Sequence, residues 1–503
     1  MPEDQSEVIA FLADPATHGG AEVERIDTHS AHVFLAGDTA WKIKRAVRYD
    51  YLDFSTLGKR KTILERELAL NAPSAPSIYR RVVAIAREAD GSLAFDGTGA
   101  PMEYALEMRR FPAEVQLDRI ADAGALDAPL ARMLGEEVAR YHDAAEVRPE
   151  DGVELIGEIL DELSRVFAGM TEDLDPQAIA EFEKKSRNHL AHLGPLMARR
   201  TRQGHVRRCH SDLHLANLVL LDGRPVPFDA LEFDERLGTC DTAYDLAFLL
   251  MDLHHRALDR QANLCLNAWI AHTRDFEALA MLPLFLAVRA AIRAMVSVQT
   301  ARATSQPVPP EAQDFLALST AYLSPPRPRL VAVGGLSGTG KTTVARQLAP
   351  MVAPVPGAVH LRSDETRKAL VGVDPLTGLP GSAYAADINQ AVYDRLLADA
   401  RACLASGHSV ILDATFLDPS RRDAVGALAR ETGCDLTAVW LTATPDTLMQ
   451  RVASRRNDAS DADAVVVASQ LARDRGPLAW IEVDADRPVE RVADALRDLV
   501  VAS

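Results

Sequence analysis

The sequence predicts an α/β protein of two domains, a mixed α+β domain over residues 1–325 and an α/β domain with a parallel sheet over residues 326–503. Three observations lead to this prediction. A chain of 503 residues is too long for one ordinary core. Three prolines between Ser324 and Arg329 end a helix and form a short, stiff spacer. From residue 329 onward, apolar strands alternate with helices, the pattern of a parallel sheet wrapped by helices.

The composition, 48% hydrophobic and 25% charged, is typical of a soluble globular protein. The net charge of −17 is spread unevenly, because the part from residue 326 onward holds 20 basic and 22 acidic residues. Almost all of the excess negative charge therefore lies in residues 1–325 and would repel nucleic acid from that part.

The five cysteines are odd in number and lie at least 25 residues apart, so they indicate neither a disulfide framework nor a paired metal site. The opening residues lack the basic start and apolar core of a signal peptide. The apolar stretch from Phe276 to Val298 is interrupted by charged residues and a proline, so it predicts a buried helix. We therefore expect a cytoplasmic protein without a membrane span, and the sequence leaves its oligomeric state open.

The first domain begins with a short amphipathic helix over residues 3–13. Residues 32–36 and 39–44 alternate as strands, and the Gly-Asp turn between them predicts a hairpin. More strands are predicted at residues 82–86 and 103–108, and the pattern becomes largely helical from about residue 127.

The stretch from His210 to Asn217 carries the chemistry of this domain. Asp212 and Asn217 stand five residues apart, the spacing of a kinase catalytic loop. A hairpin turning at Asp222-Gly223 would bring Asp229 back beside Asn217. A carboxylate can accept the proton of an attacking hydroxyl, while an amide and a second carboxylate can hold Mg²⁺ on a triphosphate.

These residues match the loop H-x-D-x-H-x-x-N, and the domain resembles the aminoglycoside phosphotransferase-like kinases, which have the two-lobed protein-kinase fold. The resemblance implies that Asp212 is the catalytic base and that Asn217 and Asp229 are metal ligands. It also implies that Lys42 contacts the phosphates of ATP, with Glu67 as its helix partner.

For several residues an alternative stays open. Glu65 is the second candidate for the partner of Lys42. We expect His210 and His214 to be structural core histidines, and we expect Asp245 to be structural as well. No G-x-G-x-x-G precedes the lysine strand, so a regulatory pseudokinase is an alternative for this domain.

The second domain contains a phosphate-binding loop of the pattern G-x-x-x-x-G-K-[ST]. Its backbone N–H groups converge on phosphate oxygens, Lys341 adds a positive charge near the β- and γ-phosphates, and the Thr342 hydroxyl is placed to bind Mg²⁺. The strand before the loop and the helix after it support the assignment. The residues expected to bind ATP here are Gly335, Gly338, Thr339, Gly340, Lys341, Thr342 and Thr343.

Two carboxylates follow strands of the predicted sheet. Asp413 ends an apolar strand in the Walker-B arrangement that holds Mg²⁺. Asp364 follows another strand and could activate an acceptor hydroxyl, while Arg367 could steady a phosphate. The alternative for Asp364 is a helix cap.

Arg451 and Arg455 stand at i,i+4 on one helix and could close over the transferring phosphoryl as a lid. Arg421 and Arg422 are either substrate contacts or residues of a helix start. With Asp364-x-x-Arg367 and Asp413-Ala-Thr-Phe, the lid arginines resemble the small P-loop kinases grouped around polynucleotide kinase and gluconate kinase. This resemblance implies that Asp364 is the base.

Together the two resemblances predict a bifunctional phosphotransferase that uses ATP and Mg²⁺. We expect a small molecule with a hydroxyl as the acceptor, and a 5′-hydroxyl nucleic acid is an alternative for the second domain. Two other functions stay open, a protein in which only the second domain is catalytic and a nucleotide-gated binding or signalling protein.

Overall fold

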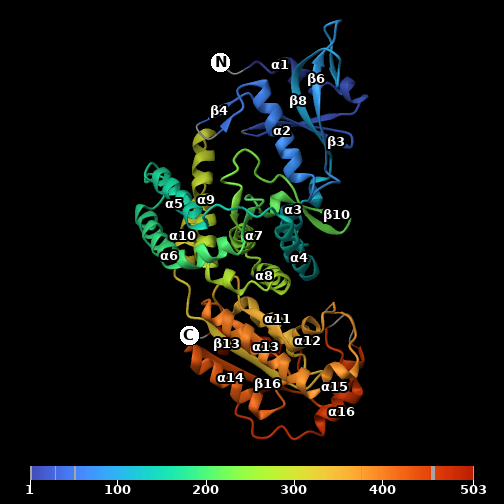
Figure 1. The fold of residues 1–503 in the computed structure, drawn as a ribbon, viewed down its shortest axis with the longest axis vertical. Coiled ribbons are helices and arrows are strands. Elements are labelled where there is room, and N and C mark those ends of the chain that lie inside the picture. Colours follow the sequence, from blue (N-terminus) through green and yellow to red (C-terminus); the bar gives the residue numbers. More distant parts are fainter. Residues whose placement is uncertain (1–2, 29, 50–51, 375, 455–458, 502–503) are drawn as a thin grey trace. The chain divides into compact units, whose positions relative to one another are not determined.

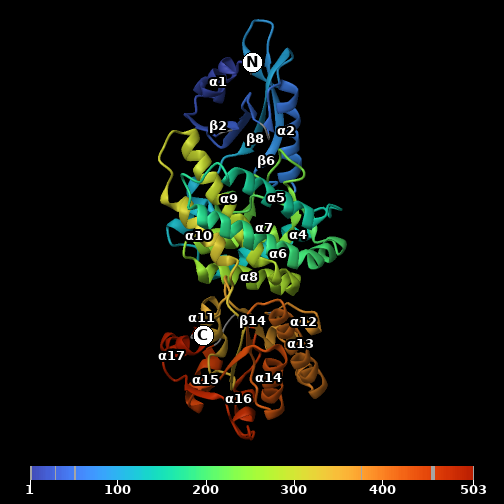
Figure 2. The same cartoon turned by 90° about the vertical axis from the view of Figure 1, so that its left-hand side faces the viewer.

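The computed structural model describes residues 3–28, 30–49, 52–374, 376–454 and 459–501. The chain forms two compact units, one of residues 1–159 and 194–249 and one of residues 160–193 and 250–503. Figures 1 and 2 show the chain from two sides. The predicted domain junction at residues 325 and 326 falls inside the second unit, before strand β13 (Arg329–Gly335).

The first unit opens with a six-stranded antiparallel sheet (Figure 1). In spatial order its strands are β1 (Val23–Asp27), β2 (Ala31–Ala36), β3 (Thr39–Lys44), β8 (Ala100–Arg109), β6 (Tyr79–Arg87) and β7 (Leu93–Phe95). The predicted hairpin is confirmed, since Ala36 pairs with Thr39. Helix α1 (Ser6–Ala13) packs on one face of this sheet, and helix α2 (Leu57–Asn71) packs on the other.

The alternation of side chains along β3 sorts its residues between these two faces. Trp41 and Ile43 enter the core that α1 covers. Lys42 and Lys44 therefore face the opposite side, where they meet Glu67 of α2. An apolar pattern on one face thus places two lysines side by side on the other.

The rest of the first unit holds a short hairpin. Apart from the longer helices described below, the strands and α-helices up to residue 249 are β4 (Arg48–Tyr49), β5 (Leu52–Asp53), α3 (Leu117–Asp122), α4 (Ala128–Ala144), β9 (Val206–Arg208), β10 (Leu218–Leu221), β11 (Arg224–Pro227) and β12 (Thr239–Asp241). Strands β10 and β11 pair across the predicted turn, where Asp222 and Gly223 both have positive φ, as a tight hairpin turn requires.

Helices make up the middle of the chain. They are α5 (Gly152–Phe167), α6 (Pro176–Arg202), α7 (Thr242–His255), α8 (Asp259–Thr273), α9 (Leu282–Ala303) and α10 (Pro310–Tyr322). The helix predicted within residues 276–298 is found as α9. It is the one helix among the described residues that is long and apolar enough to cross a membrane, and 61% of its apolar window is buried inside the protein.

The C-terminal sheet has five strands, all parallel, which confirms the predicted α/β fold. Its order is β14 (Val359–Arg362), β15 (Val410–Asp413), β13, β16 (Asp435–Thr442) and β17 (Ile481–Asp484). The helices around it are α11 (Lys341–Leu348), α12 (Ser363–Val371), α13 (Ala386–Ala405), α14 (Pro419–Thr432), α15 (Pro445–Ser454), α16 (Ala464–Leu471) and α17 (Val489–Val501). In a parallel sheet all strands end at one edge, so the loops after β13, β14 and β15 meet there.

Within the second unit, α8 covers the free edge of β14. The Asn267 side chain accepts a hydrogen bond from the His360 N–H at 2.7 Å and donates one to the Ala358 carbonyl at 3.2 Å. Asn263 donates to the same carbonyl at 3.0 Å. These amides thus satisfy one N–H and one carbonyl at the edge, which a sixth strand would otherwise bind.

Candidate functional sites

The first candidate site lies in the first unit, where β3 faces α2. The Lys42 Nζ is 2.7 Å from Glu67 Oε1 and 2.7 Å from Asp229 Oδ1. Burial works against the charge of Lys42, yet the carboxylates of Asp229, Glu67 and Glu232 raise its pKa well above the ordinary value. Lys42 is therefore a permanent cation. Glu67 is its helix partner, and Glu65 is half exposed and 3.6 Å from Lys61 instead.

The loop that follows β9 brings the predicted acidic residues to the same place. Asn217 donates through Nδ2 to Asp212 Oδ2 at 2.8 Å and to the Asp212 carbonyl at 2.9 Å. The Phe228 N–H donates to the Asn217 carbonyl at 3.1 Å, which places Asp229 directly beyond that bond. The sequence-predicted set of Asp212, Asn217 and Asp229 is thus brought together by one short hairpin.

The charge balance keeps Asp229 ionised. Burial and the neighbouring Asp212 would raise the pKa of the Asp229 carboxyl, but Lys42 and Lys44 outweigh them and hold it below its ordinary value. The residue has φ of +60°, and its N–H donates to the Tyr79 hydroxyl at 2.9 Å. A strained backbone that the surroundings hold in place is frequent at functional sites.

Asp245 holds the backbone of the loop that contains Asp212. This fully buried carboxylate accepts from the Ser211 N–H at 2.7 Å and from the His210 N–H at 3.2 Å. His210 in turn donates through Nε2 to the Phe228 carbonyl at 2.9 Å, and burial lowers its pKa so that it stays neutral. Both residues hold backbone, as a structural role requires. His214 instead lies 3.5 Å from the Asp212 carboxylate.

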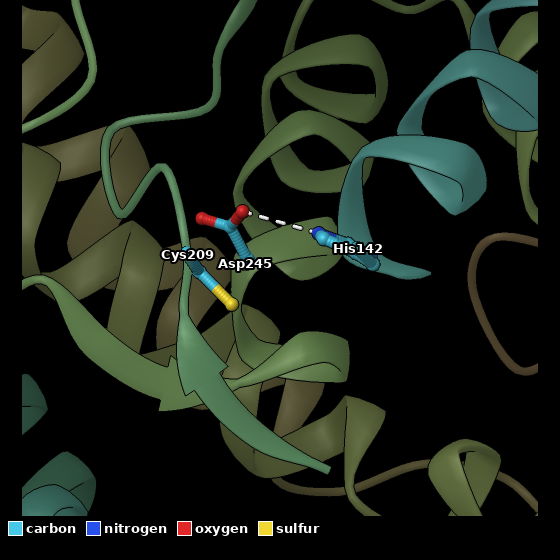
Figure 3. A group of neighbouring side chains, drawn as sticks. All are labelled: His142, Cys209 and Asp245. Carbon is cyan, nitrogen blue, oxygen red and sulfur yellow. Dashed lines mark hydrogen bonds and ion pairs between the residues drawn. The ribbon is translucent and has the colours of Figure 1, made fainter. Parts of the chain in front are cut away.

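Figure 3 shows a cluster that the sequence spacing did not reveal, His142, Cys209 and Asp245, whose ligand-type atoms all lie within 4.8 Å of one another. His142 Nε2 is 3.1 Å from Asp245 Oδ2. Hydrogen bonding with Cys240 and burial raise the pKa of the Cys209 thiol well above its ordinary value, so it is not a thiolate. The Asp245 carboxylate is also engaged by two N–H groups, so in this arrangement it holds both the His142 ring and the loop backbone.

The second candidate site is the phosphate-binding loop of the second unit. Gly335 and Gly338 have φ of +140° and +91°. A Cβ at Gly335 would lie 2.6 Å from the Leu441 carbonyl oxygen, and one at Gly338 would lie 2.7 Å from the Leu448 carbonyl oxygen. The Lys341 Nζ donates to the Leu336 carbonyl at 2.9 Å, so the lysine side chain bonds to the backbone of the same loop.

The predicted metal-binding pair lies beside this loop. The Thr342 Oγ1 donates to Asp413 Oδ2 at 2.6 Å. Burial would raise the pKa of the Asp413 carboxyl, but the hydrogen bond from His360 and the charges of His360, Arg362 and Lys341 hold it well below its ordinary value. Asp413 is therefore ionised, and its two oxygens with the Thr342 hydroxyl are the hard donors that Mg²⁺ takes.

Asp364 follows β14 and faces the same edge. The residue at the N-cap position of α12 is Arg362, and Asp364 lies within the first turn, so Asp364 is not the N-cap residue of this helix. Burial is the main cause that raises the pKa of the Asp364 carboxyl, with the charge of Asp413 adding to it, while Arg362, Lys341 and Ser460 oppose the rise. A carboxylate with a raised pKa is a better proton acceptor.

The predicted arginines are placed differently from one another. Arg451 reaches the loop, with Nη1 3.5 Å from the Thr339 carbonyl. Arg367 is buried and donates to the Ala383 carbonyl at 2.8 Å and to Asn389 Oδ1 at 2.7 Å, so its contacts hold the 383–389 segment. Its role toward a phosphate stays a prediction. Arg455 lies outside the described residues.

The two remaining arginines, Arg421 and Arg422, differ in their contacts. Arg422 is buried and donates to four backbone carbonyls, those of Phe416, Leu417, Arg475 and Pro477, so it is a structural residue. Arg421 stacks over the Tyr393 ring at 3.7 Å. Sequence reasoning missed Lys44, His360 and Arg362, since their meaning depends on partners far along the chain.

The chain is similar to several known proteins. The family described as an AAA domain matches residues 330–477. Two curated relatives described as uncharacterized proteins, one from Mycobacterium tuberculosis and one from Mycobacterium bovis, are each 30% identical over 486 residues, covering 92% of this chain and 93% of theirs.

Two solved structures also show likeness. A choline/ethanolamine kinase family protein from Mesorhizobium loti is 17% identical, with a TM-score of 0.40, over 64% of this chain and 95% of its own. The APS kinase CysC of Mycobacterium tuberculosis, in complex with AMPPNP and APS, is 19% identical, with a TM-score of 0.27, over 35% of this chain and 99% of its own.

The C-terminal part of the chain is a P-loop domain, as its parallel sheet, its phosphate-binding loop and the match to the AAA domain family show. The chain belongs to the same family as its mycobacterial relatives, because the identity extends over nearly the whole length of both.

Proposed function

We propose that the protein is a cytoplasmic, Mg²⁺-dependent phosphotransferase that uses ATP at both sites and transfers the γ-phosphoryl group to a hydroxyl of an acceptor. The observation that supports the proposal is that each site brings a lysine together with two acidic residues, Lys42 with Asp229 and Asp212 in the first and Lys341 with Asp413 and Asp364 in the second. Asp212 lies beside Asn217 and Asp229 in the first site, and Asp364 lies beside the Asp413 pair in the second.

In the first site Lys42 holds the triphosphate, and Glu67 keeps the lysine in place. Asn217 and Asp229 are the residues that would hold Mg²⁺, since each carries a side-chain oxygen of the kind that this ion binds. Asp212 accepts the proton of the acceptor hydroxyl as that oxygen bonds to the γ-phosphorus. The bond from the γ-phosphorus to the bridging oxygen breaks, and ADP leaves.

In the second site the loop N–H groups and Lys341 bind the phosphates, and Thr342 and Asp413 would hold Mg²⁺. When bound, Mg²⁺ neutralises part of the triphosphate charge. Asp364 takes the proton of the acceptor hydroxyl, and Arg451 moves from the Thr339 carbonyl toward the transferring group. The same bonds form and break as in the first site.

A small molecule is the acceptor that we favour for both sites. Charge supports this choice for the first domain, where the acidic balance disfavours nucleic acid. For the second domain a 5′-hydroxyl nucleic acid is the second candidate, because Arg421 and Arg451 are cations near the loops that surround the site.

The test uses the full chain and ATP labelled at the γ-phosphate, with panels of hydroxylated metabolites, antibiotics and 5′-hydroxyl oligonucleotides. We expect labelled products for two acceptor classes. Asp212→Asn should lower the rate of transfer to one acceptor class by roughly 10²-fold or more, because the amide cannot take the proton. Asp364→Asn should lower the rate of transfer to the other class by a similar factor. Both variants preserve side-chain shape, so each serves as the control for the other.

Two outcomes would contradict the proposal in different ways. If Asp212→Asn changes no transfer to any acceptor, the first domain is a regulatory pseudokinase. If ATP is hydrolysed slowly and no acceptor ever carries the label, the protein is a nucleotide-gated switch and not a transferase.

A further inference from the structure

A second lysine, Lys44, lies behind the Lys42–Glu67 pair. It follows Lys42 by two residues on β3, so both side chains point to the same face of the sheet. The Lys44 side chain is 1% exposed, and burying a lysine costs much free energy unless the charge is paired. Packing alone therefore does not explain why a charged side chain is buried at this position.

Lys44 is paired on two sides. Its Nζ lies 2.6 Å from Glu67 Oε2 and 2.6 Å from Glu232 Oε1. Glu67 is itself fully buried, and its other oxygen, Oε1, contacts Lys42. One carboxylate thus holds two ammonium groups, one on each oxygen.

Glu232 connects this pair to the acidic segment of the site, because it stands three residues after Asp229. A hydrogen bond also joins α2 directly to this segment, since Asn71 of α2 accepts from the Ala230 N–H at 2.9 Å. Helix α2 is therefore joined to residues 229–232 by two ionic bridges, through Lys42 and through Lys44, and by one neutral hydrogen bond.

The two lysines have different freedom. Lys42 contacts Asp229, whose side chain is 43% exposed and can turn toward a ligand. Lys44 contacts Glu67 and Glu232, which are both buried, and its Nζ lies 5.8 Å from the centre of the Phe54 ring, which is buried as well. When Lys42 exchanges Asp229 for phosphate oxygens, the Glu67 charge remains balanced by Lys44, and α2 needs no movement.

We propose that Lys44 is a positioning residue of the first site, which fixes Glu67 and the 229–232 segment in the nucleotide-binding arrangement before any nucleotide arrives. This inference rests on the proposed function of the first site. It adds that the site is assembled permanently, so that α2 does not act as a movable switch.

The test measures ATP and Mg²⁺ binding by calorimetry in full-length protein carrying Lys341→Ala, which silences the second site. Lys44→Met leaves two buried carboxylates short of a cation and can fail to fold, so the decisive variant is Lys44→Met combined with Glu232→Gln. This pair removes the bridge without leaving a charge at position 232. Lys44→Arg is the conservative control.

We expect the double variant to fold with an unchanged far-ultraviolet circular dichroism spectrum and to bind ATP about tenfold more weakly in the presence of Mg²⁺. The Lys44→Arg variant should retain most of the affinity for ATP. Without nucleotide, the amides of α2 should also exchange hydrogen faster in the double variant than in the parent. If Lys44 supported only global stability, faster exchange would not be confined to that helix.

Two results would overturn the inference. A folded double variant that binds ATP as tightly as its Lys341→Ala parent would refute the role of Lys44 alone, leaving the proposed function intact. A parent that binds no ATP at all would refute nucleotide binding at the first site, and the role of Lys44 with it.

Discussion

Thr342 and Asp413 are joined by a hydrogen bond of 2.6 Å between Oγ1 and Oδ2, although 71 residues separate them in the chain. The bond links the first turn of α11 to the end of β15. It forms because the two strands β13 and β15 are parallel neighbours whose ends reach the same edge of the sheet.

The Thr342–Asp413 pair should govern metal-dependent nucleotide binding at the second site. We expect Thr342→Val to reduce the Mg²⁺-dependent part of ATP affinity by at least about tenfold, because the hydroxyl oxygen is lost at nearly constant volume. Calorimetric titrations with and without Mg²⁺ measure this part. Thr342→Ser retains the oxygen and is the control; equal losses in both variants would contradict the assignment.

Gly338 is required for the shape of the phosphate-binding loop. We expect Gly338→Ala to abolish ATP binding at the second site, because its Cβ would meet the Leu448 backbone at 2.7 Å. Gly372→Ala is the matched control, since Gly372 also has positive φ but a Cβ there meets nothing within 4 Å. The control should lose only about 1 kcal/mol of stability and keep its ATP affinity. Similar binding by the two variants would refute the steric argument.

Asp245 should act on the first site through the backbone. In Asp245→Asn only one side-chain oxygen remains for the two N–H groups of His210 and Ser211. We expect a loss of about 1–3 kcal/mol in the free energy of unfolding, measured in urea, and weaker transfer at the first site only. Unchanged stability would show that the loop does not depend on this carboxylate.

Asn267 should stabilise the second unit by covering the edge of β14. We expect Asn267→Ala to lower the free energy of unfolding by about 1–3 kcal/mol, since the His360 N–H and the Ala358 carbonyl lose a partner. Asn188→Ala on the exposed face of α6 is the control and should be nearly neutral. A loss in the control equal to that in Asn267→Ala would point to helix propensity instead.

His408 should make stability depend on pH. This buried residue donates through Nε2 to the Gly357 carbonyl at 2.9 Å, and burial lowers its pKa from 6.5 to about 4. A lowered folded-state pKa means that the unfolded chain binds the proton first as pH falls. The stabilisation is therefore complete above pH 6.5 and is lost progressively between 6.5 and about 4.

The magnitude of this effect is at most about 3 kcal/mol by linkage. Urea unfolding at a series of pH values measures it, and His408→Asn should flatten the slope over the same window. A slope that the substitution leaves unchanged would assign the pH dependence to other groups.

Local sequence predicted a large part of both sites. The phosphate-binding loop is contiguous, so its glycines, Lys341 and Thr342 could be recognised without tertiary information. Asp212 and Asn217 are five residues apart, and the Asp222-Gly223 turn is short enough to return Asp229 beside them. Strand and helix alternation likewise predicted the parallel sheet, because its periodicity is a local property.

What could not be predicted depends on partners distant in the chain. The spacing of Lys42 and Lys44 is visible in the sequence, but only the packing of α2 shows that one carboxylate holds both. Arg422 could be a substrate contact or a structural residue until its four carbonyl partners were known.

The sequence by itself determined the elements and the chemistry of their ends, because turns, strand periods and phosphate-binding glycines act over a few residues. The tertiary structure decided which buried polar side chains meet, such as Lys44 with Glu232 and His360 with Asp413. It also decided that α8 joins the edge of β14. Such contacts depend on the packing of elements that lie some 50 to 190 residues apart, which no local pattern encodes.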